Sequence, residues 1–327
     1  MTAINRHHLL IICLLLLALS ACRRANSVAP TAQPTLTPTP RSTPLPPVPT
    51  AVPAGEEANP LRVAFVARET VRSQQIMTNA AADLEAELSA ETGLAVQVDV
   101  LDSDAEAIAA LCDSVEGTLT VAWLSGLAYS AAQAQGCGEA VLQVERDSGA
   151  LEEVLIIASR QSEIESLGDL AGKTFCRVRV TDAASWLVPS LMLRAEGVST
   201  ADLGAVVDYE DTRALVNAVA EGDCDAAGLT RSDYEQVSNN STRRAVTELE
   251  PSLEIPVAVL TYPPDLPLGA STALTDALIA LGNGTRARLL EPLLDQDAIV
   301  AADEDTFDDL RAFLDRAGVD LALLGSS

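Results

Sequence analysis

Short apolar runs alternate with amphipathic segments along most of the chain after residue 60. The run LRVAFVA at 61–67 is apolar and predicts a buried strand. Residues 73–91 carry apolar positions at helical spacing and stop before Gly93. The alternation continues with a strand at 94–101, a helix at 103–114, a strand at 118–124 and a helix at 125–135. Strands that alternate with helices predict a parallel, doubly wound sheet.

A second series of the same kind begins with the apolar run LEEVLIIAS. Its predicted elements are a helix-like segment at 163–170, a strand at 173–180, a helix at 183–196, a strand at 203–209, a helix at 211–221, and strands at 224–229 and 254–262. The tail 270–316 is predicted to be mostly helical and to pack back on the first series. The region after residue 60 exceeds what one hydrophobic core usually serves, so two lobes are expected.

The lobe boundaries follow from where the two series meet. We predict that 60–150 and 255–327 form the first lobe and that 151–254 form the second. The chain then crosses between lobes near 148–155 and returns near 250–260. The expected fold class is α/β, with a mostly parallel sheet flanked by helices in each lobe and two crossover strands.

The first 59 residues have a different composition. The apolar stretch 9–21 follows Arg6, His7 and His8, which is typical of a secretory signal at 1–21. This stretch is too short for a membrane-spanning helix, which needs about 20 apolar residues. Residues 22–59 are dominated by Pro, Thr, Ala and Ser, so we predict a disordered linker with polyproline II character.

Charge narrows the range of partners. All 47 acidic residues follow Gly55, whereas four of the 21 basic residues precede it, so the folded part carries 17 minus 47, or −30. Nucleic-acid binding depends on Lys and Arg displacing phosphate counterions, so this composition argues against nucleic acid. Both histidines lie in the signal segment, so the mature chain lacks Ser-His-Asp and Cys-His nucleophiles and histidine-based zinc sites. We therefore predict a protein that is not an enzyme and holds neither metal nor cofactor.

Four cysteines remain after the signal segment and Cys22 are set aside. An even number in an oxidising compartment favours disulfides, and four cysteines allow three pairings. We predict Cys112–Cys137 and Cys176–Cys224, because the members of each pair flank neighbouring elements of one series. Buried free thiols are the alternative.

The sequence Leu19-Ser20-Ala21-Cys22 resembles the bacterial lipobox. The resemblance implies that Cys22 is acylated and becomes the mature N-terminus, so that the protein is anchored to the extracytoplasmic side of the cell membrane. A plain secretory signal with an incidental cysteine is the alternative.

Several longer motifs point to one family. The segments RVAFVARE, VAWLSGLAYSAA, LGDLAGKTFCRV, SWLVPSLMLRAEGV, ALVNAVAEGDCDAAGL and EIPVAVLTYPPDLP occur in this order. In this order they resemble the phosphonate- and phosphite-type substrate-binding proteins of ABC transporters over most of 61–316. The resemblance implies a type II periplasmic-binding fold, in which two lobes close on a small ligand.

Ligands of such folds sit beyond the carboxyl ends of parallel strands, where helix N-termini present free N–H groups. The ligand-binding residues predicted at these positions are Arg68, Ser125, Tyr129, Thr181, Ser185, Trp186, Thr212 and Arg213. Two positions depart from the family. The segment 182–185 stands in place of a Ser-Thr-Ser phosphate grip, and Thr212 stands in place of a histidine. Structural roles are the alternatives: Tyr129 in the core, Arg68 in an ion pair and Asp182 as a helix cap.

The function favoured by the sequence is that of an extracytoplasmic solute-binding lipoprotein of an ABC importer. Its expected partners are a small molecule, either a phosphonate- or phosphite-like oxyanion or a related organic solute, and an ABC permease. The protein is expected to be a monomer that contacts the membrane only through its lipid. A lipoprotein of the same fold that acts as a ligand sensor or interaction partner without transport is the alternative.

Overall fold

The computed structural model describes residues 52–67, 71–114, 118–147 and 149–321. The predicted signal segment, the lipidated Cys22, most of the linker and the candidate ligand residue Arg68 therefore lie outside the described residues.

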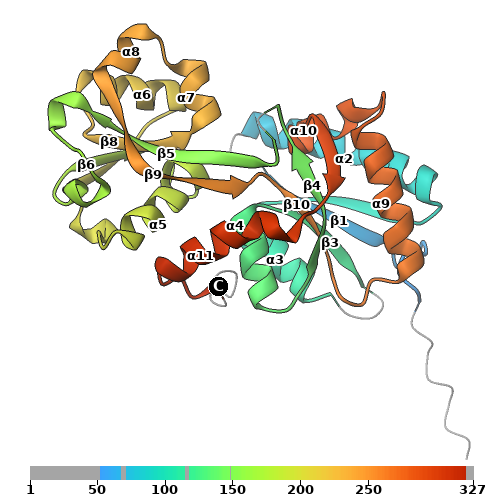
Figure 1. The fold of residues 1–327 in the computed structure, drawn as a ribbon. Coiled ribbons are helices and arrows are strands. Elements are labelled where there is room, and N and C mark those ends of the chain that lie inside the picture. The colour runs from blue at the N-terminus through green and yellow to red at the C-terminus, as the bar shows by residue number, and fades with distance from the viewer. Residues whose placement is uncertain (1–51, 68–70, 115–117, 148, 322–327) are drawn as a thin grey trace, which may run out of the picture. The chain divides into compact units, whose positions relative to one another are not determined.

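The first sheet contains six strands. In spatial order they are β11 (Ala298–Ala301), β4 (Glu139–Glu145), β10 (Val259–Tyr262), β3 (Thr120–Leu124), β1 (Leu61–Val66) and β2 (Val96–Leu101). Strand β1 pairs in parallel with β2 and β3, whereas β10 runs antiparallel to both β3 and β4 (Figure 1). β11 closes the other edge antiparallel to β4.

Helices cover both faces of this sheet and complete the first lobe. One face packs against α2 (Val71–Thr92), α9 (Leu268–Gly282) and α10 (Glu291–Leu294). The other face packs against α3 (Asp104–Cys112) and α4 (Gly126–Ala134). Strand β3 is buried along its whole length between these two layers, which explains why its residues after Thr120 are all apolar.

The second sheet contains five strands and forms the second lobe with its helices. In spatial order the strands are β7 (Ala205–Asp208), β6 (Thr174–Arg177), β8 (Ala226–Thr230), β5 (Leu151–Ser159) and β9 (Val246–Pro256). Its helices are α5 (Val188–Ala195) on one face, and α6 (Thr212–Glu221) and α7 (Arg231–Val237) on the other, with α8 (Asn240–Ala245) preceding β9.

The α/β class and the two lobes agree with the prediction, but the sheets are mixed rather than mostly parallel. In the second sheet β6 is parallel to β7 and β8, whereas β5 is antiparallel to β8 and β9. The strand by which the chain enters each sheet from the other lobe runs antiparallel to its neighbour. These strands are β5, antiparallel to β8, and β10, antiparallel to β3, and they make both sheets mixed. The chain leaves the first sheet at β4 for β5, and returns from β9 to β10. The segment 254–262, predicted as one strand, is divided between β9 and β10.

Two predicted segments differ from the structure near the start of each lobe. The linker was expected to extend to Asn59, but the Ala95 N–H donates to the Gly55 carbonyl at 2.7 Å and Ala54 packs against the first-lobe core. The ordered region therefore begins before residue 59. In the helix-like segment 163–170, only Leu167–Leu170 is helical, as a 3₁₀ turn that Ser166 and Asp169 cap reciprocally.

The C-terminal helix α11 (Asp308–Arg316), expected on the first lobe, buries its apolar face in the second lobe and contacts the first lobe at α4. Its apolar residues Leu310, Phe313 and Leu314 lie in the second-lobe core beside α5. Phe307, which directly precedes α11 in the short helix η6 (Glu304–Phe307), is instead buried in the first-lobe core. The chain therefore contacts both lobes within one helical turn of Phe307.

Both predicted disulfides are confirmed. Cys112–Cys137 joins the end of α3 to the segment after α4, and Cys176–Cys224 joins β6 to the turn before β8. The first bridge encloses β3 and α4, and the second encloses α5, β7 and α6, so each lobe has one covalent constraint.

Candidate functional site

The strand ends of the first lobe place Ser125 at the start of helix α4. The Ser125 hydroxyl accepts from the Ala128 N–H at 3.2 Å and donates to an Asp104 carboxylate oxygen at 3.0 Å. Burial raises the pKa of Asp104, and the Ser125 hydrogen bond offsets part of that effect. A substituent at Gly126 would collide with Pro256, so glycine allows α4 to begin directly beside the second crossover. Ser125 and Asp104 thus form one polar pair at this strand end.

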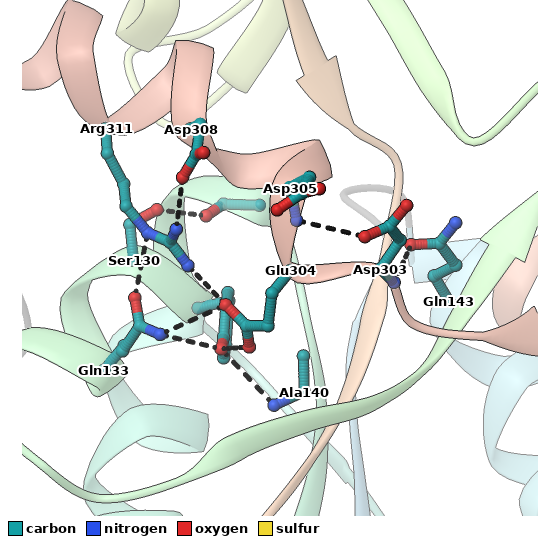
Figure 2. Close-up of polar contacts among 11 residues, drawn as sticks. Ser130, Gln133, Ala140, Gln143, Asp303, Glu304, Asp305, Asp308 and Arg311 are labelled. Carbon is teal, nitrogen blue, oxygen red and sulfur yellow. Dashed lines mark hydrogen bonds and ion pairs between the residues drawn. The ribbon is translucent and has the colours of Figure 1, made fainter.

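Tyr129 lies one turn further along α4 and is completely buried. Its hydroxyl donates to Glu304 at 2.7 Å and accepts from the Gln133 side chain at 3.1 Å and the Ala140 N–H at 3.3 Å. Figure 2 shows these three partners side by side. Its ring lies 4.6 Å from that of Phe307. Burial, together with the hydrogen bond to Glu304, raises the pKa of Tyr129 to about 12. These contacts favour the core role of Tyr129 and join α4 to the C-terminal segment.

In the second lobe the candidate residues gather at the π-helical turn η3 (Ala183–Leu187), directly before α5. Asp182 caps this turn, because its carboxylate accepts from the Ser185 N–H at 2.6 Å. The buried Ser185 hydroxyl in turn accepts from the Val178 N–H at 3.0 Å. A substituent at Gly228 would collide with Pro189 and the Ala184 carbonyl, so glycine in β8 allows this turn to sit against the sheet.

The start of this turn is therefore capped by the chain's own carboxylate, Asp182. Trp186 in the same turn is half-buried, and the Arg177 guanidinium covers its ring at 4.5 Å from the centroid. Arg177 is also paired with Asp208 at 2.7 Å across neighbouring strands β6 and β7. The face of the Trp186 ring is thus already in contact with a cation of the chain itself, and that cation is paired with Asp208.

The remaining predicted residues of the second lobe lie close to the same strand ends. Thr181 is exposed in the loop before η3. Thr212 and Arg213 begin α6, where Asp211 caps the helix by accepting from the Ala214 N–H at 2.8 Å. Arg213 is exposed, and within the described part of the chain it forms no ion pair.

A group of carboxylates at the end of β8 was not predicted from the sequence. The Thr230 hydroxyl caps helix α7 by accepting a hydrogen bond from the Asp233 N–H at 3.0 Å. Glu152, near the start of β5, accepts from the Ser232 hydroxyl at 2.7 Å and pairs with Arg146 at 2.9 Å. Burial raises the pKa of Asp233, and repulsion from Glu152 and Asp182 adds to that increase. The T-x-x-D capping pattern at 230–233 was visible in the sequence, but the approach of Glu152 depends on the antiparallel pairing of β5 with β8.

The predicted residues therefore fall into two groups. Ser125 and Tyr129 share α4 in the first lobe, whereas Thr181, Ser185, Trp186, Thr212 and Arg213 lie at the strand ends of the second lobe. The second group is accompanied by the carboxylates Asp182, Asp233 and Glu152, of which Glu152 is paired with Arg146.

Comparison with known proteins places this arrangement in a family. The model for the phosphonate-binding periplasmic component of ABC transporters matches residues 67–307. The chain belongs to this family. Its members are periplasmic substrate-binding proteins, and this family assignment supports a binding role, a small-molecule ligand and an ABC permease partner. The search of curated proteins gives no match.

Several solved structures share the fold of this chain at low sequence identity. XAC2383 from Xanthomonas citri, bound to chloride, has a TM-score of 0.62 at 15% identity, covering 79% of this chain and 97% of that one. A binding-protein component of an ABC phosphonate transporter from Pseudomonas aeruginosa has a TM-score of 0.56 at 19% identity, covering 82% and 92%. PhnD1 from Prochlorococcus marinus, in complex with methylphosphonate, has a TM-score of 0.56 at 15% identity, covering 79% and 98%. These likenesses confirm the two-lobed type II fold.

None of the helices in the ranges described is both long and apolar enough to cross a membrane. Within those same ranges, histidine, cysteine and carboxylate side chains form no group of three suited to a metal ion.

Proposed function

We propose that the protein is the extracytoplasmic receptor of an ABC importer and closes its two lobes on a small solute at the strand ends. The family assignment, the two mixed sheets and the two crossovers support this role. Closure of lobes around a ligand is a hinge motion that the permease can recognise, and it requires no chemistry. We propose accordingly that the chain is not an enzyme.

The ligand of this receptor carries a positively charged group. The observation that carries this proposal is the Asp182 cap, which takes up the Ser185 N–H at the helix start where a bare oxyanion would otherwise bind. Asp211 occupies the start of α6 in the same way, through the Ala214 N–H. Burial raises the pKa of Asp233, and the charges of Glu152 and Asp182 add to that increase. A dianion would meet repulsion here, whereas an ammonium group would be stabilised by charge-assisted hydrogen bonds.

The proposed contact residues follow from these positions. Asp233 and Asp182 face the cationic group of the ligand, and Arg213 supplies a positive charge for any anionic end of the same molecule. Thr181, Thr212, Ser185, Trp186 and Ser125 complete the predicted set, with Arg68 as a further candidate. An aminoalkyl phosphonate or another amine-bearing solute would satisfy both kinds of charge.

A thermal-shift screen of the purified protein tests the ligand class. The panel contains phosphite, methylphosphonate, methanesulfonate, simple alkylamines and aminoalkyl phosphonates. Because a ligand that binds only the native state stabilises it by mass action, amine-bearing compounds should raise Tm. Asp233→Asn should abolish that increase. Asp83→Asn, an exposed carboxylate on α2, is the control and should respond like the wild type.

Different results would contradict the cationic ligand and the importer role. Stabilisation by phosphite and methylphosphonate alone, unaffected by Asp233→Asn, would contradict a cationic ligand while leaving the importer role intact. Absence of solute uptake in cells that carry the protein with its neighbouring permease would contradict the importer role itself.

The membrane anchor is a separate proposal. Acylation of Cys22, followed by the Pro- and Thr-rich linker, would tether a monomeric receptor to the membrane surface. Fractionation of cells should find the wild type with membranes and Cys22→Ser in the soluble fraction. Equal partition of both proteins would contradict lipid anchoring.

A further inference from the structure

A pocket lies in the second lobe between α7, α8 and the beginning of β9. Its volume is about 310 Å³, within the range of small-molecule sites. It is lined by Arg160, Arg231, Tyr234, Glu235, Arg243, Val246, Thr247 and Glu248. These residues come from the 3₁₀ turn η1 (Arg160–Ser162) that follows β5, from helices α7 and α8, and from the beginning of β9. The pocket thus adjoins the end of β9 farthest from the crossover at Pro256.

Three arginines in one pocket are unusual in a folded region of net charge −30. Arg231 is already compensated, because it binds Glu153 at 2.9 Å and Glu248 at 2.7 Å. Arg160 and Arg243 are exposed and form no ion pair with any other described residue. The Arg243 Nε donates to the Ser238 hydroxyl at 2.9 Å, which leaves its two terminal amino groups to face a ligand.

Tyr234 provides an independent observation. Tyr234 as a whole residue is only 4% exposed, and its hydroxyl makes no hydrogen bond with another described residue. The hydroxyl is not one of the buried polar atoms that lack a partner, so it is accessible from the pocket that Tyr234 lines. The charges that act on it are those of Glu248, Arg243, Arg231 and Arg160. The hydroxyl can therefore donate a hydrogen bond to a molecule in the pocket.

We propose that this pocket is a second ligand site, which binds the carboxylate or phosphate head of a small organic anion through Arg160, Arg243 and the Tyr234 hydroxyl. Arg guanidinium groups bind both head groups through paired N–H donors, and a phenol supplies a third donor. Arg231 is held in place by its two glutamates and forms the fixed wall of the site. The site is independent of the solute that the lobes enclose.

Calorimetric titration of the full mature protein with inorganic phosphate and, separately, with citrate tests the site. The buffer is kept at low ionic strength, and sodium chloride of equal ionic strength is the reference, because exposed charges are screened by salt. Binding of either anion beyond the chloride reference is expected, and the tighter of the two identifies the head group. Hydrogen bonds to charged groups contribute roughly 1.5–3 kcal/mol, so Arg243→Gln should weaken binding about tenfold or more. Tyr234→Phe should weaken it by about fivefold.

Matched variants distinguish this site from general attraction and from the solute site. Arg244→Gln removes the neighbouring exposed charge on the same helix without touching the pocket, and should change the affinity less than about twofold. Asp233→Asn should also leave it unchanged. Equal losses in Arg243→Gln and Arg244→Gln, a loss in Asp233→Asn, or heats no larger than with chloride would overturn the proposal. Thermal unfolding of each variant verifies that it is folded.

Discussion

At the scale of single residues, Tyr129 shows how burial changes the role that is inferred for a side chain. The family resemblance predicts a ligand-binding aromatic residue at this position, whereas the structure gives its hydroxyl three protein partners. Its position on a helix after a buried strand could be predicted from the sequence. Its main partner, Glu304, is 175 residues away in the chain, and no local pattern identifies such a contact.

The titration of Tyr129 gives the first prediction. A tyrosine in an unfolded chain has a pKa of about 10, whereas burial and Glu304 raise that of Tyr129 to about 12. The contribution of the protonated Tyr129 hydroxyl to the stability of the fold is therefore complete below pH 10 and is lost as pH rises toward 12. Urea unfolding at successive pH values should show a smaller alkaline loss for Tyr129→Phe than for the wild type. A phenol absorbance titration in which every tyrosine ionises near pH 10 would contradict the buried environment.

Asp233 gives the second prediction, which couples stability to binding. Its pKa is raised by burial and by the charges of Glu152 and Asp182, so the ionised form is unfavourable in the folded state. That destabilisation is present above the folded-state pKa and disappears as pH falls through it. Asp233→Asn should therefore raise Tm at pH 7 by about 1–3 °C relative to the wild type. This difference in Tm should decrease in acid. A lower Tm at pH 7 would show that the carboxylate stabilises the fold.

Candidate residues could be predicted from the sequence where they depend on local structure. Asp182 as a helix cap follows from its position before η3, and Ser125 follows from the start of α4. The carboxylate group formed by Asp233 and Glu152 could not be predicted, because the register of β5 against β8 brings the two together.

At the scale of elements, strands buried on both faces were easy to find in the sequence. β1, β3 and β8 are nearly continuous apolar runs, and each was predicted within two residues of its position. Strand β4 was missed because polar residues such as Glu139 and Gln143 interrupt its apolar positions. β11 is only four residues long and lies at a sheet edge within a helical tail. The direction of the crossover strands is set by tertiary pairing, so the mixed sheets were not predicted.

The two disulfides give the third prediction. They close loops of different length, since Cys176–Cys224 spans 48 residues and Cys112–Cys137 spans 25. Chain-entropy arguments give a stabilisation of about 4 kcal/mol for the longer loop and about 3.5 kcal/mol for the shorter one. The double variant Cys176→Ser, Cys224→Ser should therefore lose slightly more free energy of unfolding than Cys112→Ser, Cys137→Ser. Chemical denaturation measures both losses, and unchanged stability in either variant would contradict a structural disulfide.

At the scale of the whole molecule, the lobes share a third connection in addition to the two crossovers. We call the segment from Glu304 to Arg316, which comprises η6 and α11, the C-terminal latch. Its Phe307 is buried in the first-lobe core, and its Leu310 and Phe313 are buried in the second. Arg311 binds Glu304 at 2.5 Å and the Gln133 side chain of α4 at 3.1 Å (Figure 2). Any hinge motion between the lobes therefore has to bend the chain within this latch.

The latch gives the final prediction. In Arg311→Gln the charge-assisted contacts that hold α11 against α4 are lost, while the buried apolar residues on both sides remain. We expect Tm to fall by only about 1–3 °C, because partly exposed ion pairs contribute little. The distribution of distances between spin labels on α2 and α6 should widen without ligand, since one restraint on hinge motion has been removed. Arg316→Gln, whose side chain lies over Phe313 of the same helix, is the matched control and should keep the wild-type distribution. Identical distributions for both variants would show that the crossovers alone set the relation between the lobes.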